Sequence, residues 1–126
     1  MQHRLLTSDE LPQGFSYPGQ LKRLAEIEAL EFQPWTILAG ERLREKYQGL
    51  KNRYPHRSLV PIAARQDYDD VACFDLNADN IICIIHDYAS AGWEQHNKKT
   101  YSTFHQWLRD AFEDFLLWGD EEADEY

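Results

Sequence analysis

The residues best suited to chemistry lie in the second half of the chain. An acidic turn, residues 65–70 (RQDYDD), is followed by Asp75 and then by the pair His86-Asp87. Carboxylates beside a histidine can ligate a divalent metal or share acid–base work. The turn lacks the glycine and distal acid of a calcium loop, and Asp is a common turn residue because its side chain bonds nearby backbone. We therefore prefer a structural turn and keep a metal-dependent hydrolase as a minor alternative, with these residues: Asp69, Asp70, His86, Asp87.

The other motifs that carry catalysis or bind cofactors are missing from the sequence. The five histidines form no HExxH pattern, and Cys73 and Cys83 form no CxxC pair. Both cysteines lie in apolar runs, where a thiol usually behaves as a small hydrophobe. The six glycines are too dispersed to form a phosphate-binding loop. We therefore expect no enzyme activity, no cofactor and no metal.

Two tryptophans stand beside residues that interrupt regular structure. Trp35 follows Pro34, and Trp93 follows Gly92. Such a residue can plug the core at the end of a sheet. It can also be the exposed anchor of a protein interface, where tryptophan is over-represented among the residues that matter most for affinity. We favour the plug and keep the anchor open.

The charge of the chain restricts its partners. It carries 13 Lys and Arg against 22 Asp and Glu, a net charge of −9. An acidic protein repels phosphate backbones and anionic lipid surfaces, so we expect neither nucleic-acid nor membrane binding. The longest apolar run has five residues, from Ile81 to Ile85, against about 20 for a membrane helix. The start of the chain has no signal-peptide pattern, so we expect a cytoplasmic protein.

The elements that must position these residues follow from patterning. With 126 residues we expect one domain, 1–126, with an irregular arm at 1–18 and an acidic tail at 120–126. Apolar spacing predicts helices over 19–32 and 39–51. Strands are predicted over 59–64, 71–74 and 81–85, the last two joined as an antiparallel hairpin. Pro61 marks an edge strand or a bulge.

The last helix has the strongest pattern in the chain. It begins at Phe104, with Ser102 as a suitable N-cap and Gly119 as a suitable stop. A wide apolar stripe should lie across the sheet, with these members: Phe104, Trp107, Leu108, Ala111, Phe112, Phe115. Helices and strands are segregated, so we expect an α+β fold in which helices pack on an antiparallel sheet.

The order of several short motifs resembles the SUKH superfamily, which comprises Smi–Knr-type regulators of cell-wall synthesis and many bacterial relatives. The resemblance covers about residues 20–118 and rests on these stretches: 32–35 (FQPW), 53–55 (RYP), 59–63 (LVPIA), 69–75 (DDVACFD), 84–87 (IIHD) and 102–108 (STFHQWL). One departure is residues 68–70 (YDD), where the family often has a Gly-Gly-Asp-type turn.

The resemblance implies a helix-packed antiparallel sheet and a binding module without catalysis. Many bacterial members are immunity proteins that neutralise a cognate toxin domain, often a nuclease. An acidic inhibitor would gain association rate against the basic substrate groove of a nuclease. The alternative is a housekeeping or regulatory adaptor that binds an endogenous protein or small ligand.

For this binding role we expect a protein partner, with a basic toxin domain as the leading case. The chain itself is expected to be a monomer or a homodimer. We expect electrostatic contacts or anchors from these residues: Asp67, Asp69, Asp70, Asp87, Glu94, Trp35, Trp93.

Overall fold

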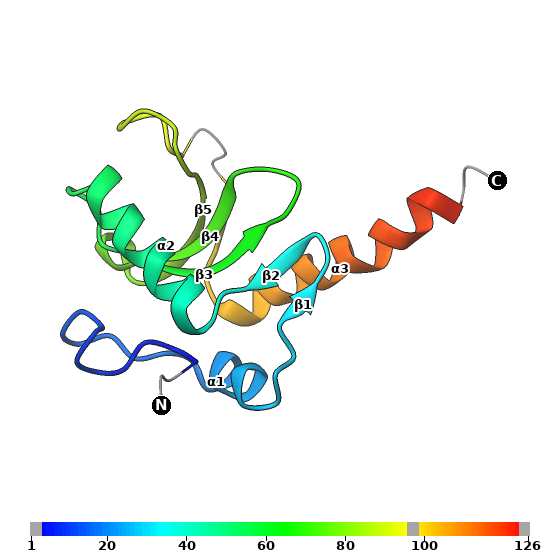
Figure 1. Ribbon diagram of the computed structural model, residues 1–126, viewed down its shortest axis with the longest axis horizontal. Coiled ribbons are helices and arrows are strands. Elements are labelled where there is room, and N and C mark those ends of the chain that lie inside the picture. The colour runs from blue at the N-terminus through cyan, green and yellow to red at the C-terminus, as the bar shows by residue number, and fades with distance from the viewer. Residues whose placement is uncertain (1–3, 96–98, 124–126) are drawn as a thin grey trace.

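The computed structural model describes residues 4–95 and 99–123 (Figure 1). Six strands form one antiparallel sheet, in which their spatial order follows the sequence. The strands are β1 (Glu31–Phe32), β2 (Trp35–Ile37), β3 (Leu59–Arg65), β4 (Asp70–Asp75), β5 (Ile81–His86) and β6 (Thr100–Tyr101). The helices are α1 (Gly19–Glu26), α2 (Gly40–Arg53) and α3 (Phe104–Ala123). The expected α+β fold with helices packed on an antiparallel sheet is confirmed.

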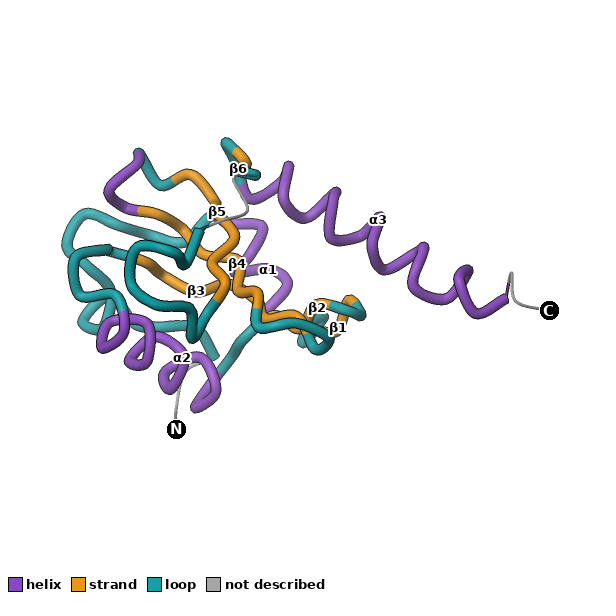
Figure 2. The backbone as a smooth tube through the Cα atoms, turned by 90° about the horizontal axis from the view of Figure 1, so that it is seen from above, coloured by secondary structure: helices purple, strands orange, loops and turns teal. Residues whose placement is uncertain are grey.

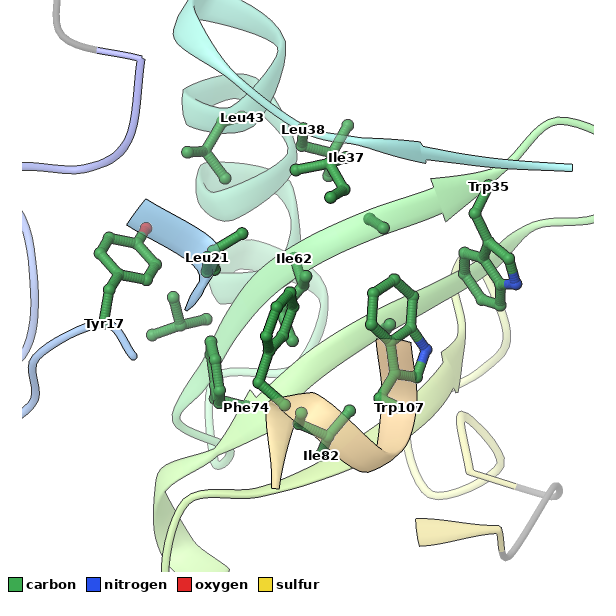
Figure 3. Close-up of a cluster of buried hydrophobic side chains, with 14 of the residues drawn as sticks. Tyr17, Leu21, Trp35, Ile37, Leu38, Leu43, Ile62, Phe74, Ile82 and Trp107 are labelled. Atoms are coloured by element: carbon green, nitrogen blue, oxygen red, sulfur yellow. The ribbon is translucent and has the colours of Figure 1, made fainter. Parts of the chain in front are cut away.

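The central strands are covered on both faces, as their unbroken apolar runs predict. Side chains alternate between two cores because successive residues of a strand point to opposite faces. In β4, Ala72 and Phe74 join a large cluster that includes Trp107 of α3, shown in Figure 3. Val71 and Cys73 join a smaller cluster on the other face, capped by the end of α2.

The predicted hairpin of β4 and β5 is confirmed, with Asp70 opposite His86 and Cys73 opposite Cys83. A short 3₁₀ turn, Leu76–Ala78, joins the two strands and is capped by the Asp75 side chain. Pro61 lies at a register shift of β3, so the bulge is confirmed, although β3 is not an edge strand. The bulge accommodates a residue that has no N–H to donate.

The first helix is shorter than predicted. α1 ends at Glu26, and Glu28 adopts a left-handed conformation with φ of 60°. The continuation of the apolar spacing through Leu30 misled the prediction, because Phe32 instead pairs with Trp35 in the β1–β2 hairpin. The Gln33–Pro34 peptide of this hairpin is cis. α2 agrees with the prediction and buries Leu43, Tyr47 and Leu50.

α3 is longer than predicted and only partly packed. Thr103, and not Ser102, accepts the capping hydrogen bond from the backbone N–H of Gln106 (3.2 Å), and the helix continues through Gly119 to Ala123. Phe104, Trp107 and Ala111 are buried as expected. Phe112 and Phe115 are exposed, because the second half of the helix runs past the sheet, as Figure 2 shows.

The N-terminal arm has no helix or strand over residues 4–18, as predicted. It nevertheless packs on the core through Leu6 and Tyr17 and is tied to α2 by an ion pair between Glu10 and Arg44 (2.7 Å). Residues 1–3 of the predicted arm and 124–126 of the predicted tail lie outside the described residues. None of the described helices combines the length and apolar character needed to cross a membrane.

Candidate functional site

Two connections meet at one end of the sheet, where β4 begins and β5 ends (Figure 1). The turn between β3 and β4 covers residues 66–69, and the segment after β5 covers residues 87–95. The backbone N–H of Asp87 donates to the carbonyl of Asp69 (2.9 Å), and that of His86 donates to the carbonyl of Glu94 (2.6 Å). These bonds hold the two connections together and place most of the predicted site residues in one region.

Three large aromatic side chains are exposed in these connections. Tyr68 and Tyr88 are each 63% exposed, and Trp93 is 72% exposed. Together with Asp67 and Asp69 we call them the aromatic rim. Their connections are joined at the base by the two backbone hydrogen bonds, and exposed tyrosine and tryptophan are the residue types that most often anchor protein interfaces. Among the described strands and their connections, these three are the large aromatic side chains that are exposed.

Cations beneath the two tyrosines order their rings. The Arg53 guanidinium lies 4.3 Å from the centroid of the Tyr88 ring, and the Lys46 ammonium lies 5.0 Å from it. Arg65 lies 5.2 Å from the ring of Tyr68. Such cation–π contacts are worth about 0.5–1 kcal/mol at exposed sites. They hold the rings in place, and a side chain that is already held in one position would lose less entropy in a contact.

The carboxylates of the rim differ in their partners. Asp67 accepts two hydrogen bonds of 2.8 Å from Arg65, and this contact lowers the pKa of Asp67 below its usual value. Asp69 is exposed, and its side chain makes no ion pair with another residue in the described part of the chain. Asp70, at the start of β4, is partly buried and lies 3.1 Å from His86 Nδ1. Asp69 therefore supplies the uncompensated negative charge of the rim.

Asp87 lies inside the fold, against the prediction that it contacts a partner. It is 1% exposed and accepts hydrogen bonds of 2.7 Å from Lys46 and Arg53 of α2. Burial raises the pKa of Asp87, but the hydrogen bonds from Arg53 and Lys46 outweigh it and leave the pKa below the usual value. This carboxylate fastens α2 to the end of β5, so its role is structural.

Glu94 is also internal, against the same prediction. Arg57 donates to Glu94 (3.0 Å) and to Asp75 (2.9 Å), and both carboxylates are buried. Burial raises the pKa of Glu94, while hydrogen bonds from backbone and from Arg57 lower it to a value below the usual one. Neither Arg53 nor Arg57 forms an ion pair with the acidic turn in the described part of the chain. Arg53, at the end of α2, pairs with Asp87 after β5, and Arg57 pairs with Asp75 at the end of β4 and with Glu94.

Trp35 is the core plug, and the anchor alternative does not fit its environment. Its side chain is 4% exposed and meets the ring of Trp107 edge-on at 5.5 Å. The indole N–H donates to Asp114 of α3 (3.3 Å). Trp35, Asp87 and Glu94, which we call the inner group, leave no surface for a partner to contact. Four predicted residues remain at or beside the rim: Asp67, Asp69, Asp70, Trp93.

The sequence analysis did not find Tyr68 and Tyr88. Each follows an aspartate in a connection, and tyrosine in a polar loop is too common to be informative. Residues 66–69 are all exposed, so the pattern of the acidic turn does not single out Tyr68. The left-handed φ of 68° at Tyr88, which turns the chain out after β5, has no sequence signature here.

The metal alternative gains no support from the geometry, and both cysteines are internal. Within residues 4–95 and 99–123, no three His, Cys, Asp or Glu side chains gather where they could hold a metal ion. Cys73 and Cys83 face each other across β4 and β5 as free, fully buried thiols. Burial raises the pKa of Cys83 to about 11 and that of Cys73 well above its usual value. Both are therefore protonated packing residues at neutral pH.

A small polar cavity of about 180 Å³ lies between Trp35, the sheet and α3. Its charged groups pair with one another: Lys99 and Tyr101 bond to Asp110, and Arg65 lies 3.6 Å from Asp114. These pairs satisfy the carboxylates and tie β6 and β3 to α3. The cavity is therefore part of the packing between α3 and the sheet.

No family model, curated protein or solved structure matches this chain. The resemblance to the SUKH superfamily stays a prediction from the sequence. The candidate site therefore rests on the geometry of the aromatic rim.

Proposed function

We propose that this chain is a non-enzymatic protein-binding domain that holds a basic partner protein against the aromatic rim. The observation that carries the proposal is the exposure of Tyr68, Tyr88 and Trp93 in two connections that backbone hydrogen bonds join at one end of the sheet. Trp and Tyr dominate the energetics of protein interfaces because they bury large area with few rotatable bonds.

The charge of the chain selects the partner. A net charge of −9 and the unpaired carboxylate of Asp69 favour a positively charged surface opposite the rim. Complementary charge acts mainly on the association rate and is screened by salt. The complex should therefore form quickly at low salt, while the three aromatic side chains determine how slowly it dissociates.

The resemblance to SUKH proteins gives this role its most concrete form. On that basis the partner is a cognate toxin domain, with a nuclease as the leading case because its substrate groove is basic. The chain would act in the cytoplasm, where it would cover the toxin before it reaches its substrate. A surface that blocks by covering needs no catalytic residue, and the rim has none to offer.

Affinity capture with matched variants tests the proposal. Wild-type chain, Trp93→Ala and Leu117→Ala are immobilised and exposed to lysate of the source cell at 50 mM and 500 mM salt. Leu117 is a suitable control because it is exposed on α3, away from the rim. Bound proteins are identified by mass spectrometry, and their genes are then tested for toxicity with and without the chain.

We expect a basic protein that wild type and Leu117→Ala retain at low salt and that Trp93→Ala loses. Its toxicity should be relieved by co-expression of wild type and not of Trp93→Ala. The assignment of the rim would be overturned if Trp93→Ala and the double variant Tyr68→Ala/Trp93→Ala both retained the protein as well as wild type does. Retention of a non-toxic endogenous protein at high salt would support the adaptor role and contradict toxin immunity.

A further inference from the structure

The chain is acidic, but helix α2 is basic along one side. α2 has five basic and two acidic residues, whereas the whole chain carries a net charge of −9. Arg42, Lys46, Gly49 and Arg53 follow one another at spacings of four, three and four residues, so they share one face of the helix. We call this face the α2 stripe. It is a place where an anion can approach a chain that otherwise repels it.

A pocket of about 310 Å³ opens against the α2 stripe, and we call it the α2 pocket. The three cations of the stripe line it. The rest of its described lining is one acid with apolar and aromatic side chains: Glu45, Leu38, Ala64, Tyr88. Its volume is at the lower end of the range found for small-molecule sites, about 300–1,000 Å³. The α2 pocket therefore suits a small ligand with both a charged and an apolar part.

The charges at the α2 pocket do not cancel. Lys46 and Arg53 share one carboxylate, that of Asp87, which is 1% exposed. Arg42 is exposed, and its side chain forms no hydrogen bond or ion pair within residues 4–95 and 99–123. The three cations therefore exceed the two carboxylates, of Asp87 and Glu45, by one positive charge.

The two paired cations keep donors for a second acceptor. An ammonium has three N–H donors and a guanidinium has five. Lys46 uses one donor on Asp87 and Arg53 uses two, in hydrogen bonds of 2.7 Å. The side chains of Lys46 and Arg53 are 19% and 29% exposed and line the pocket. A ligand in the pocket can therefore accept hydrogen bonds from cations that Asp87 already orients.

Gly49 leaves the space that the Arg53 guanidinium occupies. A Cβ atom at position 49 would lie 2.6 Å from Nη2 of Arg53 and 2.9 Å from Nη1. Glycine inside a helix is less favourable than alanine, so this position gives up helix stability for the close approach of the guanidinium. The ring of Tyr88, with its centroid 4.3 Å from the guanidinium, adds a further contact. Arg53 is thus held in one position, which lowers the entropy that a contact with a ligand would cost.

We propose that the α2 pocket binds the carboxylate of a small organic acid. The carboxylate would accept charge-assisted hydrogen bonds from Arg42 and Lys46, and its single charge matches the excess of one positive charge. A phosphate with two charges would be repelled more strongly by Asp87 and Glu45.

The apolar part of the acid would lie against Leu38 and Ala64. The α2 pocket has Tyr88 in common with the aromatic rim. The proposal nevertheless does not rest on the proposed function, because no partner protein is needed to fill this pocket.

Benzoate is the probe, because it joins a carboxylate to a compact apolar ring. It is titrated into the nitrogen-15-labelled full chain at 50 mM salt, and amide shifts in NMR spectra give both the affinity and the place of binding. Benzamide has the same ring without the charge, and inorganic phosphate has the charge without the ring. A blocked tripeptide with a central glutamate presents the same carboxylate as a protein side chain would. We expect benzoate to bind most tightly of the four, with shifts at residues 42–46 and 88.

Matched charge variants locate the site. Arg42→Gln should weaken benzoate binding about fivefold, because it removes one charged donor from the pocket. Arg23→Gln removes the same charge from an exposed position on α1 and should change the affinity by less than about twofold. Glu45→Gln should strengthen binding about threefold, because it removes a negative charge from the lining. All three positions are exposed, and unchanged circular dichroism and melting temperature will establish that each variant is folded.

Three results would overturn the proposal. Equal weakening by Arg42→Gln and Arg23→Gln would mean that only the overall charge matters. Binding of benzamide as tight as that of benzoate, or tighter binding of phosphate or the tripeptide, would contradict the ligand class. Shifts confined to residues 4–7 and 22–26, which line another pocket with two cations, would place the acid there instead. No partner protein takes part in these titrations, so their outcome is independent of the affinity capture at the aromatic rim.

Discussion

The inner group and the aromatic rim contain the same kinds of residue in opposite environments. Trp35 is 4% exposed and Trp93 is 72% exposed, although each follows a residue that interrupts regular structure. Asp87 holds two cations of α2, whereas Asp69, on the other side of the same backbone hydrogen bond, pairs with none in the described chain. The comparison teaches that residue type near a strand end does not separate a structural role from a binding role. The two roles are separated by the contacts that other helices and strands make with that residue.

The two tryptophans should give the largest contrast. Trp35→Ala removes an edge-on ring contact and a hydrogen bond from the core and should lower the free energy of unfolding by about 3–5 kcal/mol. Trp93→Ala should change it by less than about 0.5 kcal/mol, as is usual at an exposed site. Urea unfolding followed by circular dichroism measures both. Similar losses in the two variants would contradict the division between inner group and rim.

The two aspartates should give a smaller contrast of the same sign. Asp87→Ala leaves Lys46 and Arg53 without their counter-charge, and we expect a loss of about 3 kcal/mol, at the lower end for broken buried pairs because both cations reach solvent. Asp69→Ala should be within about 0.5 kcal/mol of wild type. The same urea titrations measure the free energy of unfolding of both variants. A stable Asp87→Ala variant would mean that α2 is held by apolar packing alone.

Acid should lower the free energy of unfolding, because it protonates carboxylates that form ion pairs in the fold. The Arg44 hydrogen bond, aided by the Thr7 backbone, lowers the pKa of Glu10 from 4.5 to about 2, and the pKa values of Asp87 and Glu94 are lowered too. In the unfolded chain these groups take up protons near their usual pKa, while in the fold they resist until lower pH. Their stabilisation is therefore complete above about pH 4.5 and is lost progressively towards pH 2.

Urea midpoints at pH 7, 4.5 and 3 test this linkage. The urea midpoint of wild type should be similar at pH 7 and pH 4.5 and should be lower at pH 3. Glu10→Gln should start lower at pH 7 and fall less steeply between pH 4.5 and 3. An identical pH profile in wild type and Glu10→Gln would show that the Arg44 contact does not distinguish the folded from the unfolded state.

The smallest effect on stability should accompany a clear effect on binding. Asp69→Asn keeps the size of the side chain and removes its charge, so the fold should be unaffected. Against a basic partner at the rim, the association rate should fall a few-fold at low salt and converge with wild type at high salt. Stopped-flow or surface-based kinetics measures it. An unchanged association rate would remove Asp69 from the encounter surface.

Much of the fold was predictable because local patterns specify it. The apolar runs of β4 and β5, separated by turn residues, predicted a hairpin covered on both faces. The spacing of Leu43, Tyr47 and Leu50 predicted α2. The β1–β2 hairpin was not predictable from spacing, because Leu30 and Phe32 continue a helical pattern that the left-handed Glu28 ends. α3 was predicted, but its burial was not, since periodicity does not say how far the sheet extends.

The candidate site was predictable in part. The acidic turn and the loop after β5 were found because acidic and aromatic residues in connections stand out against apolar strands. The sequence by itself determined the α+β class, the hairpin of β4 and β5, and the acidic character of the chain, since composition and spacing along one strand or helix suffice for these.

Only the tertiary structure decided which acidic and aromatic residues face solvent. Lys46 and Arg53 lie more than 30 residues from Asp87 in the sequence and reach it because α2 packs beside the end of β5. Trp107 covers Trp35 because α3 crosses the sheet there. Burial and pairing depend on such long-range contacts, and no local pattern contains them.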